Sequence, residues 1–434
     1  MPPTAPIGFL GLSHLGLVTS IAWASRGDDV IGVDRDNSII AALTRSQIPV
    51  HEPGLAELLR SARPRMTFNT DVATLAACPL VVLSQDVPTT EDNRGDVSAI
   101  RKLVEEAIPH LEPLTTLVLM SQLPPGFTRS LVERIGRNHP DKHLAVFYWV
   151  ETLVFGQAVD RVLHPERIML GCEAPDCLLP DVLKRELELF GCPVQRMRYE
   201  SAELTKAAIN LYLACGVTFA NTLSDLCERV GADWSEVIPA LRLDARIGPA
   251  AYIHPGLGIS GGNLERDLVM LRTLAEEYGT DTSLIEAIVA CNARRLRWVL
   301  DKLESLVFAY VPVPTIAVWG LAYKKGTHSL KNSPALSVIS SLRSRATIRA
   351  YDPVVQSPVL AEGTTVASSR DEALAHADCL LIMTGWDEFE TVDAATLMRA
   401  MRNPVVIDCV GALEKRREEF KGIRYVSMGR GMID

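Results

Sequence analysis

The stretch that decides the fold is Ile7-Gly-Phe-Leu-Gly-Leu-Ser-His-Leu-Gly-Leu17. A short apolar run ends at Leu10, a glycine follows it, and an apolar helical pattern begins just beyond. Asp34 stands at the end of the next apolar run. A strand, a glycine turn and a helix, with an acidic residue after the second strand, are typical of a domain that binds a dinucleotide.

Each residue type in this pattern has a physical role. Gly11 permits a tight turn, Gly16 permits close packing of helix on strand, and the free amides at the helix N-terminus attract a pyrophosphate. Asp34 can accept hydrogen bonds from ribose hydroxyls and repels a 2′-phosphate, which favours NAD over NADP. Ser13 stands where a second glycine is usual, and its small side chain still leaves room. The alternative is that these glycines serve only the turn.

Further along the chain, short apolar runs alternate with helical periodicity, which predicts stacked β-α units and a parallel sheet. Ser98–Ile108 is one predicted amphipathic helix. The expected strands of this first region are Ile7–Leu10, Asp29–Val33, Leu80–Ser84, Thr116–Met120 and His143–Phe147.

A long helix is predicted from about Ser201 to Val230, and its length suits a connector between domains. More helix follows to about Glu304, interrupted by a glycine-rich loop at Pro255–Gly262. Alternation of strands and helices then restarts, and both ends of the chain share a strand-glycine-helix opening. The expected strands of the last region are Thr315–Trp319, Thr347–Tyr351, Asp378–Met383 and Val405–Asp408.

These patterns predict an α/β protein in which two Rossmann-like, doubly wound domains are joined by a long helix and a helical middle domain. The expected boundaries are 1–200 for the NAD-binding domain, 201–304 for a helical dimerisation domain and 305–434 for a substrate domain. A length of 434 residues fits roughly three domains at about 150 residues each.

Composition narrows the class of protein. The chain is 47% hydrophobic and 22% charged, which is typical of a folded globular protein. Its formal net charge of −9 disfavours nucleic acid as a partner. No export signal is legible after Met1, and the charge-free stretch Ser305–Tyr323 contains two prolines, so no membrane span is expected. The nine scattered cysteines fit reduced thiols better than a metal site, and we expect a soluble, cytoplasmic protein.

With these residues in place, the chain resembles the UDP-glucose/GDP-mannose dehydrogenase family of nucleotide-sugar oxidoreductases over nearly its full length. Each motif alone is weak, but their order along the chain is specific. The matching segments are His51-Glu-Pro-Gly-Leu, Val87-Pro-Thr-Thr, Ser121-Gln-Leu-Pro-Pro-Gly, His164-Pro-Glu-Arg-Ile, Glu203-Leu-Thr-Lys-Ala-Ala-Ile-Asn, Asp244-Ala-Arg-Ile-Gly, Gly320-Leu-Ala-Tyr-Lys and Asn332-Ser-Pro-Ala-Leu.

The resemblance implies an NAD-dependent oxidation of a nucleotide sugar by a homodimer. It places cofactor contacts at Gly11, Ser13, His14, Leu15, Gly16, Asp34, Arg35, Thr89, Ser121 and Lys331. It places substrate contacts at Thr152, Leu153, Arg246, Gly258 and Lys324. Members of the family carry out two hydride transfers with two NAD, and the second transfer needs a cysteine thiolate to trap the aldehyde.

The sequence departs from the family where that cysteine is expected. The family pattern Gly-x-Gly-Gly-x-Cys-x-Pro-Lys-Asp reads Gly258-Ile-Ser-Gly-Gly-Asn-Leu-Glu-Arg-Asp here, so Asn263 takes the place of the nucleophile. Gln122 replaces a threonine that helps to hold a catalytic water, and Phe155 replaces a glutamate. We therefore do not expect the four-electron oxidation to a uronate, and Trp149 with Phe155 predicts a drier pocket.

Enough remains for one hydride transfer. Lys206 can stabilise an alkoxide or take the hydroxyl proton, and Asn210, four residues on, can bond the same oxygen. Asp267 can orient Lys206 or relay a proton, and Glu151 is a second acid or base. Together with Asn263 these form the candidate catalytic set. The structural alternative is a plain ion pair between Lys206 and Asp267.

Recognition of a diphosphate is expected to be weaker than in the family. Lys331 replaces an arginine and lacks its bidentate fork, and Asp408-Cys-Val-Gly lacks another arginine of the family. A nucleoside or a monophosphate is therefore a possible substrate beside a nucleotide sugar. A purely solvated role for Lys324 and Lys331 stays open.

Three functions follow from this sequence. The first is a dehydrogenase that makes an aldehyde or a ketone and releases NADH. The second is a dehydratase (lyase) or epimerase that keeps NAD bound and oxidises only transiently. The third is a non-catalytic paralogue, against which the retention of Lys206, Asn210 and Asp267 argues. An ordinary UDP-sugar 6-dehydrogenase is a further alternative.

Overall fold

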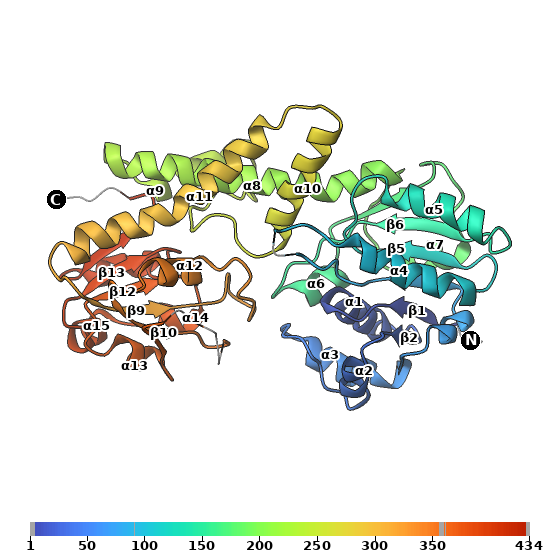
Figure 1. Cartoon of the computed structure of the whole chain (residues 1–434), viewed down its shortest axis with the longest axis horizontal. Helices are drawn as coiled ribbons and strands as arrows, with labels where there is room; N and C mark the ends of the chain where they lie inside the picture. The colour runs from blue at the N-terminus through green and yellow to red at the C-terminus, as the bar shows by residue number, and fades with distance from the viewer. Residues whose placement is uncertain (1–4, 91, 356–359, 361, 431–434) are drawn as a thin grey trace. The chain divides into compact units, whose positions relative to one another are not determined.

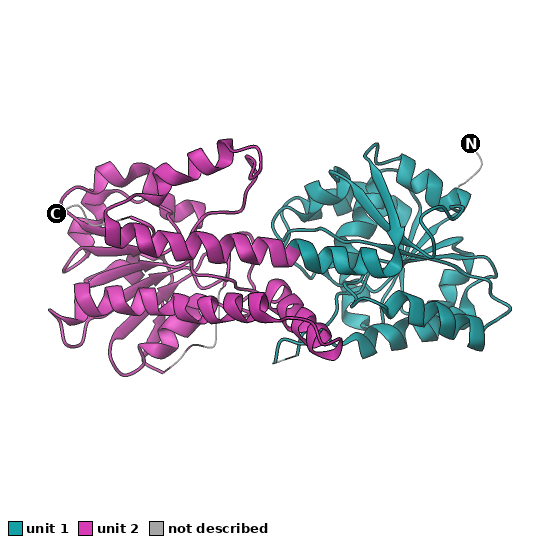
Figure 2. Ribbon diagram, turned by 90° about the horizontal axis from the view of Figure 1, so that it is seen from above, with its two compact units in different colours: residues 1–209 teal, residues 210–434 magenta. Residues whose placement is uncertain are grey.

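The computed structural model describes residues 5–90, 92–355, 360 and 362–430. The chain divides into two compact units, Met1–Ile209 and Asn210–Asp434, which Figure 2 colours separately. Each unit is built on a sheet of its own, with the elements labelled in Figure 1. Residues 1–4, which bear on the expected lack of an export signal, lie outside the described residues.

The sheet of unit 1 has eight strands in the order β3-β2-β1-β4-β5-β6-β7-β8. Its neighbouring strands run parallel except for β6 and β7, which are antiparallel. Strands β1, β4 and β5 are buried at every residue, as strands covered on both faces are. The strands are β1 Ile7–Leu10, β2 Val30–Val33, β3 Met66–Asn69, β4 Leu80–Leu83, β5 Thr116–Leu119, β6 Ala145–Trp149, β7 Ile168–Cys172 and β8 Val194–Arg198.

Two hydrophobic cores lie on the two faces of this sheet. Because successive strand residues point to opposite faces, Phe9 packs with Trp23 in one core and Leu10 packs with Ile100 in the other. Trp149 also belongs to the first core, where its ring lies 5.9 Å from that of Trp23. The helices of the unit are α1 His14–Ser25, α2 Asn37–Thr44, α3 Leu55–Ala62, α4 Val97–Ala107, α5 Phe127–Asn138, α6 Ala158–Leu163 and α7 Asp181–Glu188.

Helix α8, Tyr199–Val230, is 32 residues long and carries the chain from unit 1 into unit 2. By length and composition it could cross a membrane, although 39% of its most apolar window is buried. Its buried polar side chains Glu203, Lys206 and Asn210 all bond to other protein groups. That behaviour is typical of a core helix.

Unit 2 combines a helical region with a second sheet. Its helices after α8 are α9 Trp234–Leu243, α10 Asn263–Glu277, α11 Ser283–Leu303, α12 Pro334–Ser341, α13 Arg370–Leu374, α14 Asp387–Glu390 and α15 Ala394–Ala400. The sheet is parallel throughout, in the order β11-β10-β9-β12-β13-β14. Its strands are β9 Thr315–Trp319, β10 Thr347–Tyr351, β11 Thr364–Val366, β12 Cys379–Ile382, β13 Val405–Asp408 and β14 Arg424–Ser427.

The predicted fold class is confirmed, with local differences. Strand β6 begins at Ala145 and not at His143, because His143 has a positive φ of 48° that a strand cannot contain. The expected strands did not include β3, β7, β8, β11 and β14. The edge strands β3 and β8 lack an apolar run, whereas β7 is buried at every residue. The three domain boundaries stay a prediction.

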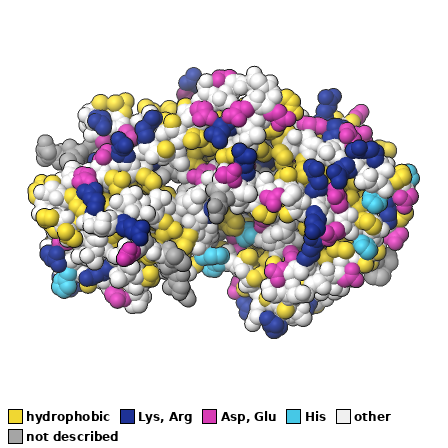
Figure 3. All heavy atoms as spheres, viewed as in Figure 1, with side chains coloured by type: hydrophobic (Ala, Val, Ile, Leu, Met, Phe, Trp, Pro, Cys, Tyr) yellow, Lys and Arg dark blue, Asp and Glu magenta, His cyan; other side chains and the backbone are white. Residues whose placement is uncertain are grey.

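The surface is charged but mixed in sign. Figure 3 shows basic and acidic side chains interspersed on one face of the molecule. Several form exposed ion pairs, such as Arg60 with Glu57 at 2.9 Å. Pairs of this kind contribute little to stability, so we assign them no role beyond solvation.

Candidate active site

The loop between β1 and α1 has the geometry of a dinucleotide site. Gly11 has a φ of +90°, and a Cβ on Gly16 would lie 1.9 Å from the carbonyl oxygen of Gly11. Both positions therefore require glycine. Ser13 fits because its hydroxyl turns to the end of β4, where it accepts a hydrogen bond from Asp86 N–H at 2.7 Å.

The N-terminus of α1 already holds an anionic group. The Leu15 amide donates to the Asp86 carboxylate at 3.1 Å, and Asp86 is exposed. A helix N-terminus attracts negative charge, so a pyrophosphate at this place would displace Asp86. The chemistry of this loop fits NAD, with Asp86 as a competing anion.

Asp34 lies where the ribose is expected. One of its carboxylate oxygens accepts the Leu12 amide at 2.7 Å and the other accepts the Asp36 amide at 2.9 Å. A carboxylate offers about four acceptor sites, so half of its capacity is left for two ribose hydroxyls. Arg35, also predicted here, pairs instead with Glu106 on α4.

His14, the first residue of α1, joins the loop to the segment before α6. Its Nε2 lies 2.9 Å from a Glu52 carboxylate oxygen, and its ring centroid lies 4.2 Å from that of Phe155. Glu52 is buried and also accepts the amides of Gly156 and Ala158 at 3.0 and 2.8 Å. Glu52 lies in a segment that matches the family, but its sequence gave no sign of this role.

Phe155 and Trp149, the two residues behind the expectation of a drier pocket, lie in different surroundings. The Phe155 ring lies tilted against His14 beside the dinucleotide loop, while Trp149 is 6% exposed and packs in the core. Trp149 also lines a pocket together with Glu151, Thr152 and Leu153, and the drier pocket stays a prediction. Of the other predicted cofactor residues, Ser121 is buried and donates to the Gln85 carbonyl at 2.6 Å, and Thr89 pairs with Gly95.

Lys206 is held by a carboxylate. Its Nζ lies 3.4 Å from Glu151, and the two side chains are only 10% and 16% exposed. The Leu153 amide donates to the other Glu151 oxygen, and the Thr152 carbonyl accepts from Arg161 at 3.0 Å. The segment that carries Glu151, Thr152 and Leu153 is thus fixed in front of α8.

Glu203 positions this end of α8 and was quoted from the sequence without a role. It accepts the amides of Gly126 and Thr128 at 2.7 Å each and the Thr128 hydroxyl at 2.6 Å. These bonds tie α8 to the N-terminus of α5. Burial raises the pKa of Glu203, against the hydrogen bonds that lower it.

Asn210, one turn after Lys206 on α8, is hydrogen-bonded within unit 2. Asn210 Nδ2 donates to the Asp267 carboxylate on α10 at 2.5 Å, and both side chains are buried. Lys206 and Asn210, four residues apart on one helix, therefore each have a carboxylate partner. The predicted catalytic residues Glu151 and Asp267 supply those two carboxylates.

Asn263 is the first residue of α10 and follows the glycine-rich loop. Its Oδ1 accepts from Arg266 at 3.4 Å. Gly258 and Gly261 have φ values of +91° and +84°, and a Cβ on Gly261 would meet the Tyr323 ring at 2.7 Å. Residues 258–267 contain no sulfur atom.

Two ionisable groups lie beside this loop. Asn332 donates to the Gly261 carbonyl at 2.9 Å and to the Glu265 carboxylate. Burial raises the pKa of Glu265 to about 7, while the charge of Lys331 opposes the rise. Lys331 thus lies near Glu265, and Lys324 Nζ lies 5.8 Å from the centroid of Tyr323.

Arg246 lies on the surface of unit 2. Its guanidinium binds Asp244, two residues earlier, at 2.6 Å, and its side chain is 89% exposed. Within the described ranges, no group of three or more His, Cys, Asp or Glu side chains is placed to hold a metal ion.

Comparison with known proteins places the chain in a family. Three domain models of the UDP-glucose/GDP-mannose dehydrogenase family match this chain. The NAD binding domain matches residues 5–188, the central domain residues 200–294 and the UDP binding domain residues 317–415. The chain belongs to the UDP-glucose/GDP-mannose dehydrogenase family. This family comprises NAD-dependent nucleotide-sugar dehydrogenases, so the predicted cofactor NAD and the predicted family are confirmed.

Individual relatives agree over the whole length. A UDP-glucose 6-dehydrogenase of Rhizobium meliloti is 34% identical, covering 98% of this chain and 99% of the relative. A UDP-glucose dehydrogenase structure from Pyrobaculum islandicum has a TM-score of 0.86 at 25% identity, covering 99% and 98% of the two chains. A UDP-D-ManNAc dehydrogenase structure from Pyrococcus horikoshii has a TM-score of 0.86 at 23% identity, covering 99% and 100%, and shows the fold alone.

Proposed function

We propose that this dehydrogenase oxidises one hydroxyl of a nucleotide-linked sugar by two electrons and stops at the carbonyl. The observation that carries the proposal is Asn263, an amide in a loop without sulfur, where the resembling family has its nucleophile. NAD, when bound by the β1–α1 loop, supplies the acceptor for the electron pair. The residues of the chain must then bind the sugar and move one proton.

Lys206 is the proposed proton acceptor. It is buried except for 10% of its side chain and has Glu151 at 3.4 Å. Nζ can pass a proton to the Glu151 carboxylate, and the neutral amine then takes the proton of the sugar hydroxyl. Low exposure keeps water from competing for the same proton. The Glu151 carboxylate is held by the Leu153 amide and needs no rearrangement to act.

Asn210 is the proposed partner of the sugar oxygen. Its Nδ2 carries two protons and gives one to Asp267, which leaves the second for an alkoxide. The Asp267 carboxylate fixes the orientation of the amide. Such an oriented donor stabilises charge that develops during the reaction.

A second oxidation would need a thiolate to make the carbonyl carbon tetrahedral again. An amide at position 263 cannot form this adduct. Cys215 packs against the apolar cluster that contains Ile259 of the loop, and burial raises the pKa of its thiol, which disfavours the thiolate. We therefore propose an aldehyde or a ketone as the product.

We further propose that the protein is a homodimer that forms along α8. Tyr212, Phe219 and Leu226 follow one another at intervals of seven residues and are 71%, 45% and 52% exposed. An apolar stripe of this spacing is suited to a second copy of the same helix. The exposed Arg246 would then reach the substrate of the partner subunit.

All nine cysteines are free thiols, which fits a reducing compartment such as the cytoplasm.

The mass of the product tests the proposed function. Incubation of the protein with NAD and a UDP-sugar should yield a product lighter by two hydrogens. A product lighter by one water, or an isomer of unchanged mass, would show a dehydratase or an epimerase instead. A uronate would overturn the proposal.

Lys206→Ala should lower kcat by about 10²- to 10⁴-fold, the usual contribution of a positioned base. NAD affinity should stay within about twofold of wild type, because Lys206 does not belong to the dinucleotide loop. Glu133→Ala, an exposed acidic residue on α5, serves as the control. Unchanged turnover in Lys206→Ala would exclude Lys206 as the base.

A further inference from the structure

The glycine-rich loop of unit 2 is held by side chains of two helices. The Gly256 amide donates to Asn221 Oδ1 on α8 at 2.8 Å, and the Gly256 carbonyl accepts from Arg295 Nε on α11 at 2.8 Å. The Ile259 amide donates to Asn292 Oδ1 on α11 at 2.6 Å, and its carbonyl accepts from Asn292 Nδ2 at 3.2 Å. Both backbone polar groups of two loop residues are thus satisfied by side chains.

Two of these side chains are in the interior of the unit, and Asn292 is half-buried. Asn221 is 8% exposed and Arg295 is 3% exposed. An irregular loop cannot pair its own backbone as a strand or a helix does, and buried polar groups need partners. Gly258 lies between the two held residues, and a Cβ there would meet Asn292 Oδ1 at 2.2 Å. The contacts therefore fix the path of the loop through Gly258.

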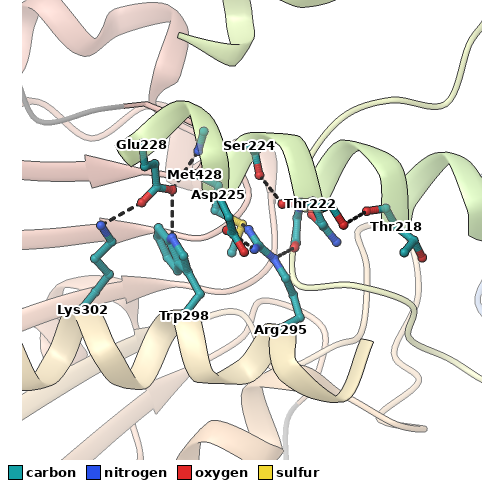
Figure 4. Close-up of polar contacts among 12 residues, drawn as sticks. Thr218, Thr222, Ser224, Asp225, Glu228, Arg295, Trp298, Lys302 and Met428 are labelled. Carbon is teal, nitrogen blue, oxygen red and sulfur yellow. Dashed lines mark hydrogen bonds and ion pairs between the residues drawn. The ribbon is translucent and has the colours of Figure 1, made fainter. Parts of the chain in front are cut away.

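Arg295 is itself fixed from three sides. In addition to its bond to the Gly256 carbonyl, the Arg295 guanidinium binds Asp225 on α8 at 2.5 Å. It also lies 3.0 Å from the Met428 sulfur, as Figure 4 shows. One turn further along, Glu228 on α8 joins Trp298 and Lys302 on α11, each at 2.8 Å. The two helices thus form a braced support for the loop.

We propose that Asn292 and Arg295, with Asn221, are positioning residues that hold Gly256–Ile259 in the form that receives the nucleotide sugar. This inference rests on the proposed function for the identity of the ligand. The three side chains act through the loop backbone. If these bonds are lost, the loop is ordered in only a fraction of the molecules. The apparent affinity for the nucleotide sugar falls in proportion to that fraction.

Substitutions of Asn292 separate this role from general stability. Asn292→Ala loses both bonds to Ile259. Asn292→Asp keeps the acceptor for the Ile259 amide and loses only the donor. Arg297→Ala removes an exposed side chain from the same helix and serves as the matched control. Hydrogen exchange of the peptide that contains Gly256 and Ile259 is measured for each, together with KM and kcat for UDP-glucose and Kd for NAD.

We expect loop exchange in Asn292→Ala to be about tenfold faster than in the control, with Asn292→Asp between them. The KM for UDP-glucose should rise by about tenfold in Asn292→Ala, while kcat and the Kd for NAD change by less than about twofold. A variant that only loosens the fold would alter all three constants.

If hydrogen exchange of the loop in Asn292→Ala is no faster than in Arg297→Ala, the proposal that these side chains hold the loop is overturned. Faster exchange with an unchanged KM would overturn its role in substrate binding. If Asn292→Ala does not fold, the ordering of Asn292→Asp against the control decides in the same way. Failure of the proposed function would appear differently, as wild-type protein without turnover, and hydrogen exchange would still decide whether the loop is clamped.

Discussion

The first strand of each β-α-β unit is followed by a similar glycine turn, but the aspartates that bind the two turns have different numbers of partners. In each, the first strand of the β-α-β unit is followed by a glycine of positive φ, Gly11 at +90° and Gly320 at +94°. In each, an aspartate at the end of the next strand accepts amides of that turn, Asp34 in unit 1 and Asp352 in unit 2. The same local sequence solution thus occurs twice in one chain.

The two aspartates differ in what they have left to offer. Asp352 is 6% exposed and accepts five N–H groups, from Leu321, Ala322, Val354, Val355 and the Trp386 indole. Asp34 is half-buried and accepts two. Beyond β4, unit 1 has the exposed Asp86, whereas beyond β12, unit 2 has Trp386, whose indole donates to Asp352. The aspartate at the glycine turn of unit 1 thus keeps acceptor sites for a dinucleotide. The acceptor sites of the aspartate in unit 2 are taken by N–H groups of its own unit.

Replacing Asp352 should produce the largest effect in this comparison. Asp352→Ala leaves several buried N–H groups without an acceptor, so we expect a loss of about 3 to 5 kcal/mol in the free energy of unfolding of unit 2. Urea unfolding measures the loss, and Asp352→Asn should cost less because the amide oxygen still accepts. A stable Asp352→Ala protein would show that this aspartate is not a structural lock.

Asp34→Ala should act on the cofactor and not on the fold. Loss of two charged hydrogen bonds to ribose predicts about 10²-fold weaker NAD binding, and less discrimination against NADP. Fluorescence titration with both cofactors measures the change. Equal NAD affinity in Asp34→Ala and wild type would mean that the two openings do not differ as argued.

Replacement of Asp86, whose carboxylate lies at the N-terminus of α1, should change NAD affinity less than Asp34→Ala does, and in the opposite direction. Asp86→Ala removes a carboxylate that binds the Leu15 amide, so NAD should bind about threefold to fivefold more tightly. Asp141→Ala, another exposed acidic residue of unit 1, is the control. Weaker NAD binding in Asp86→Ala alone would mean that Asp86 assists the cofactor.

Glu265 predicts the smallest effect, in the pH dependence of stability. Its pKa is raised by burial to about 7 in the folded protein. A raised pKa favours the protonated form, so this group's contribution to stability is present below the unfolded pKa and is lost as pH rises through about 7. Glu265→Gln should therefore melt about 2 °C higher than wild type at pH 8 and equally near pH 4.

Differential scanning calorimetry at both pH values measures this difference. Equal melting temperatures at pH 8 would show that Glu265 ionises freely.

The sequence predicted the parts of the molecule that rest on periodicity and on glycine turns. The strand at Ile7–Leu10, the helix after Gly11 and the helix through Lys206 and Asn210 are as expected. The apolar runs of buried parallel strands are readable because both faces are covered. Edge strands such as β8 are polar and short, so no such run marks them.

Partnerships across the fold could not be predicted in the same way. Glu151 was expected as a second acid or base, but its pairing with Lys206 depends on where β6 ends. The roles of Glu52 and Asn292 depend on loops distant in sequence, and a single polar residue in a helix gives no signal of them. The replacement of the family's cysteine by Asn263 depends on one residue type alone, and its consequence for the reaction stays a prediction.

The number of NADH molecules formed per molecule of nucleotide sugar consumed tests the central claim most directly. With the sugar limiting and NAD in excess, the absence of sulfur around Asn263 predicts one NADH and a carbonyl that a hydrazine reagent traps. Two NADH per sugar, with a carboxylate that resists trapping, would contradict it.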